Sequence, residues 1–131
     1  MGIENDEEAQ DFLFGRVLHV NCGKSALGDV RTDQFCLAPG TKWADCHHLP
    51  FWDRSFDTVV MSNVPVKDKL AERQKWLGEL ARVAKKRIVI INDAVFPIPG
   101  FRFSFFYVLK GKPKASILTV YDREELEGAA S

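Results

Sequence analysis

The fold is decided by residues 16–23, RVLHVNCG, a short apolar run that ends in a glycine turn. Its length and its β-branched content favour a buried strand. Two more runs of this kind follow, DTVVMSN at residues 57–63 and RIVIIN at residues 87–92. Near-continuous apolar runs are typical of parallel strands that are covered on both faces. The sequence therefore predicts an α/β fold with a parallel sheet.

The segments between these runs decide which helices cover the sheet. Short strands are expected at residues 30–35 and 41–44. Residues 24–32 contain Gly28 and have no apolar stripe long enough for a crossover helix, so none is expected there. Residues 67–86 do have helical periodicity. The residues that form its apolar face are Leu70, Leu77, Leu80, Ala81 and Ala84, widened by Trp76 and Val83.

The C-terminal part, residues 94–131, is an atypical tail. Aromatic and apolar residues alternate there, at Phe101, Phe103, Phe105, Tyr107 and Leu109. A turn at 111–113 and a β-prone segment at 115–121 follow, so this region predicts an antiparallel hairpin. Residues 122–125, Asp-Arg-Glu-Glu, are typical of a helix N-terminus, with a capping aspartate and a glutamate three residues later.

Composition limits the classes of protein that are compatible with this chain. The length of 131 residues fits a single domain over 1–131, and the fractions of charged residues, 27%, and aromatic residues, 11%, exclude a disordered chain. Lys and Arg number 18, as do Asp and Glu, and this balance argues against a nucleic-acid partner. No apolar run reaches about 18 residues, and residues 1–11 are an acidic lead-in, unlike a signal peptide. We expect a cytoplasmic protein with no membrane segment.

The three cysteines, Cys22, Cys36 and Cys46, are an odd number without a C-x-x-C pair, which argues against a disulfide framework or a zinc ribbon. The run Cys46-His47-His48 suggests a metal ligand set. However, adjacent residues rarely point at one ion, and no second cluster supplies further ligands. We therefore expect a polar loop and no metal.

Two interpretations of the turn after the first strand can be compared. Residues 22–25, Cys-Gly-Lys-Ser, resemble the end of a phosphate-binding loop, but Leu18 stands where that motif needs a glycine. Alternatively, Gly23 ends a strand at the carboxyl edge of the sheet, where doubly wound folds bind nucleotides. Asp33, at the end of the next strand, would then accept hydrogen bonds from both ribose hydroxyls.

Four segments in order resemble class I S-adenosylmethionine-dependent methyltransferases. Residues 17–23, VLHVNCG, resemble the glycine motif V-L-D-V-G-C-G, and VVMSNV at 59–64 is similar to the fourth strand. Ala44-Asp45 with LPFWDRSFD at 49–57 resembles the block A-D-x-x-x-L-P-F-x-D-x-S-F-D, and ELARV at 79–83 matches E-x-x-R-V. The resemblance covers residues 16–93. It implies a minimal Rossmann-like sheet with parallel strand order 3-2-1-4-5, followed by the antiparallel hairpin.

The resemblance also implies S-adenosylmethionine as the cofactor and assigns nine residues to it. Asn21, Cys22 and Gly23 would pass beneath the methionine part, and Asp33 would hold the ribose. Asp45 and Cys46 would meet the adenine, whereas the residues flanking the methyl donor would be Ser62, Asn63 and Val64. No catalytic residue and no methyl acceptor follow from the resemblance.

Several departures from the family pattern keep a second hypothesis open. His19 replaces an acid, Asn21 replaces the first glycine, and only ten positions separate Gly23 from Asp33. The chain is therefore either an S-adenosylmethionine-dependent methyltransferase or a catalytically inactive relative, which binds the cofactor or acts as a partner subunit. In the second case, a homodimer or partner contact through residues 101–107 is expected.

Overall fold

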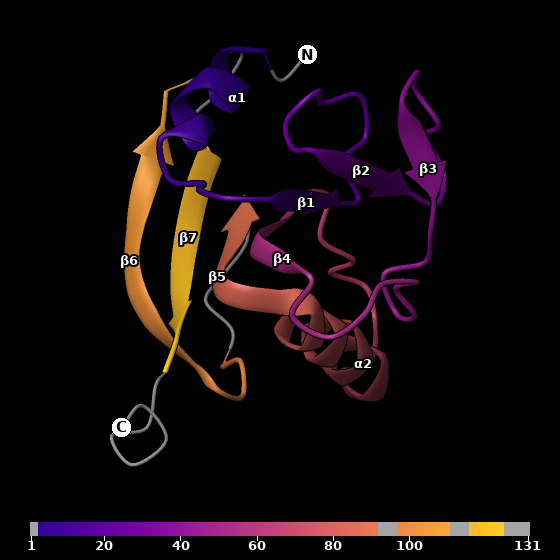
Figure 1. Cartoon of the computed structure of the whole chain (residues 1–131), viewed down its shortest axis with the longest axis vertical. Coiled ribbons are helices and arrows are strands. Elements are labelled where there is room, and N and C mark those ends of the chain that lie inside the picture. Colours follow the sequence, from indigo (N-terminus) through magenta and orange to yellow (C-terminus); the bar gives the residue numbers. More distant parts are fainter. Residues whose placement is uncertain (1–2, 92–96, 111–115, 125–131) are drawn as a thin grey trace.

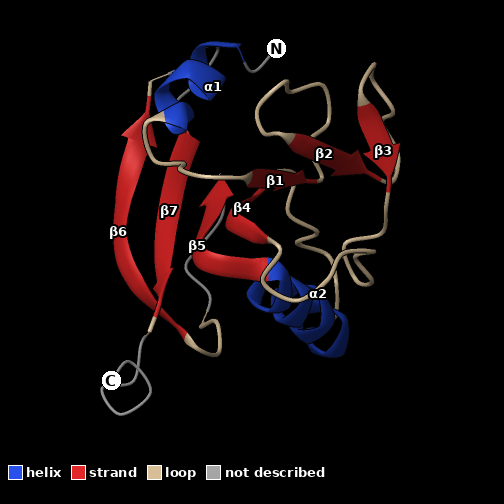
Figure 2. Ribbon diagram, viewed as in Figure 1, coloured by secondary structure: helices blue, strands red, loops and turns tan. Residues whose placement is uncertain are grey.

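The computed structural model describes residues 3–91, 97–110 and 116–124, through which one mixed sheet runs. Its strand order is β3-β2-β1-β4-β5-β7-β6 (Figures 1 and 2). The strands are β1 (Val17–Val20), β2 (Val30–Asp33), β3 (Thr41–Trp43), β4 (Phe56–Met61), β5 (Ala84–Ile91), β6 (Phe101–Leu109) and β7 (Ser116–Arg123). The described helices are α1 (Ile3–Gln10) and α2 (Leu70–Val83).

The direction of each strand agrees with the sequence prediction. β1 pairs in parallel with β2 and with β4, while β2 pairs in parallel with β3 and β4 with β5. β7 then pairs antiparallel with β5 on one side and with β6 on the other. The parallel order 3-2-1-4-5 and the C-terminal hairpin are confirmed. The turn predicted at 111–113 lies outside the described residues.

Alternate residues of the central strands face two apolar clusters. Leu18 and Val20 of β1 face α2, where Trp76 and Leu80 are fully buried. Val17 belongs to the other cluster, which includes residues of α1, β4, β5 and the hairpin. Because both faces are covered, β1, β4 and β5 need near-continuous apolar sequence, and this requirement explains the three runs that predict the fold.

The boundary between α2 and β5 differs from the sequence prediction. The helix was expected to extend to Lys86, but it ends at Val83, and β5 begins at the next residue. Ala84 pairs with Phe56 of β4, so sheet pairing takes residues 84–86 out of the helix. Leu70, expected on the apolar face, is the first residue of α2 and is 69% exposed.

The predicted helix N-terminus at residues 122–125 is also wrong for the residues that the structure describes. Asp122 and Arg123 belong to β7. The Asp122 carboxylate does not cap a helix. It accepts hydrogen bonds from Arg87 Nε at 2.8 Å and from the Ser104 hydroxyl at 2.6 Å. Cross-strand pairing, which is not a local property, overrides the capping pattern here.

The connection from β1 to β2 contains no helix in the described structure, as the sequence predicts. Buried His19 holds it instead, with Nδ1 3.0 Å from the Leu27 carbonyl oxygen and Nε2 2.7 Å from the Ser62 hydroxyl. The carbonyl can only accept, so Nδ1 carries the proton and Ser62 donates to Nε2. Burial lowers the pKa of His19 to about 4, so the ring is neutral near pH 7. His19 thus ties a helix-free loop to the end of β4.

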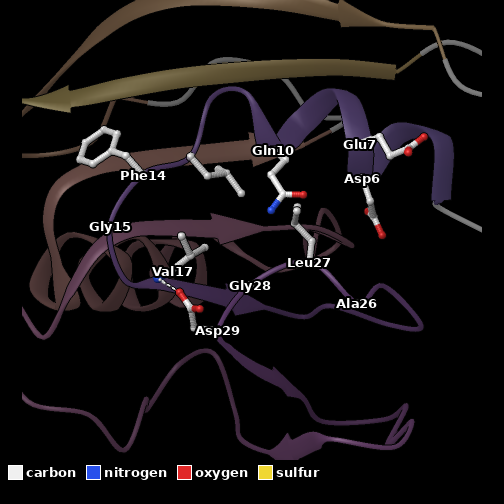
Figure 3. Close-up of a pocket in the computed structure, with 11 residues that line it drawn as sticks. Asp6, Glu7, Gln10, Phe14, Gly15, Val17, Ala26, Leu27, Gly28 and Asp29 are labelled. Atoms are coloured by element: carbon white, nitrogen blue, oxygen red, sulfur yellow. Dashed lines mark hydrogen bonds between the residues drawn. The ribbon is translucent and has the colours of Figure 1, made fainter.

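A hollow of about 520 Å³ lies between α1 and this loop (Figure 3). Leu27, Gly28 and Asp29 border it on the loop side, and the Asp29 carboxylate accepts the Val17 N–H at 2.8 Å.

No helix in the described part of the chain is long and apolar enough to cross a membrane. The cytoplasmic location stays a prediction.

Candidate cofactor site

A second pocket, of about 460 Å³, lies where the turns after β1, β2, β3 and β4 meet. The carboxyl ends of parallel strands share one edge, and a ligand crevice is expected where the strand order reverses, here between β1 and β4. The residues that line the pocket are Asn21, Gly23, Asp33, Gln34, Phe35, Cys36, Cys46, His47, Asn63, Pro65 and Asp68.

The structure brings five of the nine expected cofactor residues into this pocket. They are Asn21, Gly23, Asp33, Cys46 and Asn63. The other four do not line it. Cys22 is buried with Sγ 3.6 Å from the Thr41 hydroxyl, and Ser62 donates to His19. Val64 packs against the core, and Asp45 contacts His47 beside the pocket.

Asp33 organises the backbone around the pocket. Its Oδ2 accepts the Gly23 N–H at 2.8 Å, and Oδ1 accepts the N–H groups of Phe35 and Cys36 at 2.7 and 2.8 Å. The carboxylate therefore joins the turn after β1 to the turn after β2. A carboxylate oxygen can accept two hydrogen bonds, so Oδ2 retains one site for a hydroxyl group.

His47 also lines the pocket, and it lies between two carboxylates. Its Nδ1 is 2.6 Å from Asp45 Oδ1, and its Nε2 is 2.7 Å from Asp68 Oδ2. Partial burial by itself lowers the His47 pKa, but the hydrogen bonds and charges of the two carboxylates outweigh it and raise the pKa. The imidazole ring thus connects the segment after β3 to the segment after β4.

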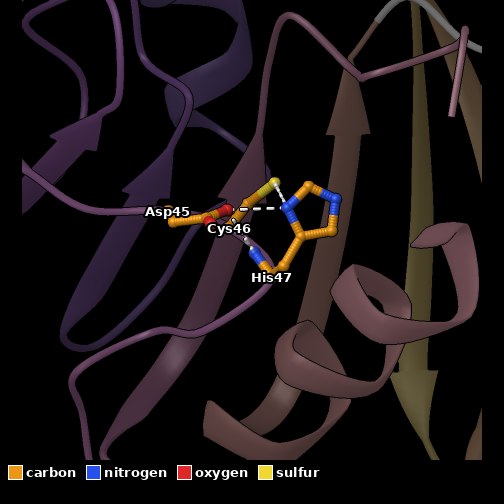
Figure 4. Close-up of side chains that lie close together, drawn as sticks. All are labelled: Asp45, Cys46 and His47. Atoms are coloured by element: carbon orange, nitrogen blue, oxygen red, sulfur yellow. Dashed lines mark hydrogen bonds and ion pairs between the residues drawn. The ribbon is translucent and has the colours of Figure 1, made fainter.

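Asp45, Cys46 and His47 cluster closely, with one potential ligand atom from each within 4.8 Å of the others (Figure 4). Both ring nitrogens of His47 already face carboxylates. Burial raises the pKa of the Cys46 thiol to about 11, so this thiol is protonated near neutral pH. The described contacts are those of a carboxylate–imidazole–carboxylate chain, and the absence of a metal stays a prediction.

The loop that follows, residues 49–53, is held by the two charged residues of the ELARV motif. Arg82 Nη1 donates to the Phe51 carbonyl at 2.6 Å, and Nη2 donates to the Leu49 carbonyl at 2.9 Å. Glu79 accepts the Leu49 N–H at 2.8 Å and two hydrogen bonds from Arg82. Two motifs that lie apart in the sequence therefore form one unit.

Sequence reasoning missed six of the residues that line the pocket, namely Gln34, Phe35, Cys36, His47, Pro65 and Asp68. A signal for the three residues after Asp33 does exist, because an aspartate that ends a strand often accepts the N–H groups two and three residues later. No local signal links His47 to Asp68, 21 positions away in the chain.

Comparison with known proteins agrees with this architecture. The family model described as a methyltransferase domain matches residues 7–91, more than half of the chain, so the chain belongs to this methyltransferase family. Comparison with the curated proteins finds no match.

Solved structures of methyltransferases share the fold at low identity. Magnesium protoporphyrin IX methyltransferase from Synechocystis PCC 6803, solved with bound S-adenosylmethionine, has a TM-score of 0.62 at 13% identity, covering 93% of this chain and 81% of that one. An S-adenosylmethionine-dependent methyltransferase from Thermotoga maritima has a TM-score of 0.68 at 14% identity, covering 93% and 89%. A TehB-like methyltransferase from Corynebacterium glutamicum has a TM-score of 0.63 at 16% identity, with the same coverage.

Proposed function

We propose that this chain is an S-adenosylmethionine-dependent methyltransferase that binds its cofactor in the 460 Å³ pocket. The observation that carries the proposal is the position of the pocket, at the strand-order reversal of a sheet from a methyltransferase family. Its volume lies within the range of roughly 300–1,000 Å³ that is usual for cofactor pockets. A related fold from Synechocystis holds S-adenosylmethionine, which supports the same cofactor here.

The residues of this pocket suit the parts of that cofactor. Asp33 Oδ2 retains an acceptor site for a ribose hydroxyl, while Gly23 lets a ligand approach the backbone closely. Asp45 lies beside the pocket, next to Cys46, and its Oδ2 has no described partner and can accept from the exocyclic amine of adenine. Asn63 follows β4 and lines the pocket, where it would flank the methyl donor, whereas Cys22, Ser62 and Val64 do not line the pocket.

Bound S-adenosylmethionine supplies an electrophilic methyl group on a sulfonium centre. The residues of the chain must hold the acceptor atom in line with the bond between the methyl carbon and the sulfur. The acceptor also has to lose a proton if it is a neutral nucleophile. We assign no residue to this proton transfer, and the class of acceptor stays open.

Calorimetry with S-adenosylmethionine and S-adenosylhomocysteine tests the proposal. Asp33→Asn keeps the shape of the side chain but removes its charge, and we expect it to weaken binding about 10- to 100-fold, the effect of losing a charged hydrogen bond. Asp29→Asn is the matched control, because Asp29 also accepts a backbone N–H at 2.8 Å but faces the other hollow. No heat from the wild type at millimolar ligand refutes the proposed function.

A second candidate function, as a subunit that pairs with a copy of itself, is favoured by the hairpin. β6 is the outer strand of the described sheet, and its pairing with β7 places four apolar side chains on one face. They are 45–60% exposed, and they are Phe103, Phe106, Val108 and Ile117. An open, apolar edge strand readily pairs with another chain. The four residues are called the hairpin patch below.

Light scattering during size-exclusion chromatography tests this second candidate. We expect a dimer that dissociates on dilution and that Phe106→Ser in the hairpin patch converts to monomer. Leu37→Ser is the matched control, because Leu37 is 58% exposed but lies outside the patch. A wild type that remains monomeric at high concentration excludes self-association through the hairpin.

A further inference from the structure

Exposed cations gather where β1, β4 and β5 begin, at the edge of the sheet opposite the carboxyl ends that form the cofactor pocket. Arg16 directly precedes β1, and its Cζ lies 4.9 Å from the centre of the Phe56 ring, at the first residue of β4. Arg54 lies in the turn that leads into β4, and its N–H donates to the Arg82 carbonyl near the end of α2 at 2.8 Å. Together with two lysines of β5 they are called the basic edge, which consists of Arg16, Arg54, Lys85 and Lys86.

A shift in strand register exposes the two lysines together. Between two paired positions β4 advances by two residues, from Phe56 to Thr58, while β5 advances by three, from 84 to 87. Consecutive side chains of a regular strand point to opposite faces, but an extra residue in one strand interrupts this alternation. Lys85 and Lys86 are accordingly both exposed.

The positive charges of the basic edge are not neutralised by ion pairs. In the described ranges of the chain, none of its four residues pairs with an Asp or a Glu. Asp53 pairs with Arg82, and Asp122 pairs with Arg87. Asp57 accepts a backbone N–H at 2.8 Å. The four cations are therefore free to attract an anion from solution.

Arg54 also repels a neighbouring arginine. Arg123 Nη2 donates to the carbonyls of Ala81 and Ala84, both at 2.6 Å, so its guanidinium lies at the end of α2. Burial lowers the pKa of Arg123, and the charge of Arg54 lowers it further. Because like charges disfavour each other, a neutral side chain at position 54 would relieve this repulsion. Stability of the fold therefore does not explain the cation at this position.

An exposed aromatic residue belongs to the same turn as Arg54. Trp52 is 87% exposed, and its carbonyl accepts a hydrogen bond from the Ser55 hydroxyl at 2.7 Å. Proteins that bind single strands combine cations, which contact the phosphates, with exposed aromatic rings, on which the bases stack. A duplex offers the phosphates but keeps its bases stacked inside. The basic edge with Trp52 thus has the chemistry that suits a single strand.

The zero total charge of the chain does not describe this edge. Lys and Arg equal Asp and Glu at 18 each, but the carboxylates of Asp33, Asp45 and Asp68 lie in or beside the pocket, at the carboxyl ends of the strands. Folding therefore separates charges that cancel in the sequence total. We propose that the basic edge and Trp52 bind a single-stranded nucleic acid, with phosphates on the four cations and bases on the indole ring. This proposal does not depend on the proposed function, because the surface lies at the opposite edge from the pocket.

Fluorescence anisotropy with a fluorescein-labelled oligouridine of about 20 nucleotides tests the proposal without any cofactor. For single strands, log Kd rises with log salt by about 0.7 per phosphate contact, so four contacts predict a slope of about 3. The double variant Lys85→Gln/Lys86→Gln removes two contacts and should reduce this slope to about half. Lys67→Gln/Lys69→Gln is the matched control, because it removes two exposed lysines that lie between β4 and α2.

Two further variants separate stacking from charge. We expect Trp52→Ala to weaken binding about tenfold without changing the salt slope, a value within the range for bases that stack on aromatic rings. Trp43→Ala is its matched control, because Trp43 is 59% exposed on β3. Arg54→Asn, which suits the φ of 55°, should lower the slope and leave Tm unchanged or higher. A purely structural role for the charge of Arg54 would lower Tm instead.

The other outcomes overturn the proposal. The absence of oligouridine binding at low salt refutes it, as does a salt slope that the Lys85/Lys86 variant leaves unchanged or that the control reduces equally. Equal affinity of Trp52→Ala and wild type refutes stacking and makes the basic edge a site for any polyanion. Binding to phosphatidylserine vesicles without binding to oligouridine refutes the nucleic acid in favour of a membrane surface.

Discussion

Substitution of Arg82 tests how the loop at residues 49–53 is held beside the pocket. Its guanidinium holds the loop at 49–53 through the carbonyls of Leu49 and Phe51 and makes two hydrogen bonds to Glu79. The hydrogen bonds to Glu79 raise the pKa of Arg82 further above its ordinary value. Substitution Arg82→Met keeps the apolar stem but removes every one of these donors.

The expected cost follows from burial. The Arg82 side chain is 30% exposed and that of Glu79 is 20% exposed, so their contacts are partly shielded from water, whereas Asp53 is 76% exposed and contributes little. Each charged hydrogen bond is worth about 1.5 kcal/mol or more when buried. After discounting for solvent, we expect Arg82→Met to cost about 3 kcal/mol of unfolding free energy. This corresponds to roughly 9 °C in Tm for a domain of this size.

Urea unfolding followed by circular dichroism measures this cost. Lys75→Met on the same helix is the control, because the Lys75–Glu72 pair has side chains 53% and 46% exposed and should contribute only about 0.3 kcal/mol. A double-mutant cycle with Glu79→Gln should give a coupling of about 1 kcal/mol or more. A loss below about 1 kcal/mol for Arg82→Met, or one equal to the control, refutes the reasoning.

Four further predictions concern two histidines and two glycines. Burial lowers the His19 pKa from 6.5 to about 4, so its contribution to stability is complete above pH 6.5 and falls by about 3 kcal/mol toward pH 4. In urea unfolding, the free energy of unfolding of His19→Gln should then fall less steeply below pH 6.5 than that of the wild type. His47 has the opposite effect on the pH dependence of stability, because its pKa is raised. Its contribution to stability is complete below pH 6.5 and is lost as the pH rises through the folded pKa. An NMR titration should place the wild-type midpoint above 6.5 and that of Asp68→Asn lower. Gly15→Ala should cost about 2 kcal/mol or more in thermal unfolding, because φ is +64° and the new Cβ collides with the Asp57 carboxylate. Gly78→Ala, in open space on α2, should instead stabilise by about 0.5–1 kcal/mol.

The sequence by itself determined the sheet and its family. Apolar runs as dense as those of β1, β4 and β5 suit strands with both faces covered, and the alternation at residues 101–109 predicts the hairpin. The pattern of apolar residues along a strand is a local property of the sequence. It can therefore be recognised without knowing which strands lie beside it in the sheet. The same holds for the absence of a helix between Gly23 and Asp33, which no apolar stripe supports.

Only the tertiary structure decided which side chains meet. Asn21 contacts Asn63, which is 42 positions away in the sequence. Asp122, predicted to cap a helix, instead accepts a hydrogen bond from Arg87. The tertiary structure also moved residues 84–86 from helix to strand, because pairing of Ala84 with Phe56 of β4 extends β5 back to the end of α2. Such contacts depend on which strand ends share an edge and on the rotamers there, and neither is encoded in a periodic pattern. The strand pattern therefore predicted the parallel sheet, and side-chain contacts between the turns at its carboxyl edge determined the shape of the pocket there.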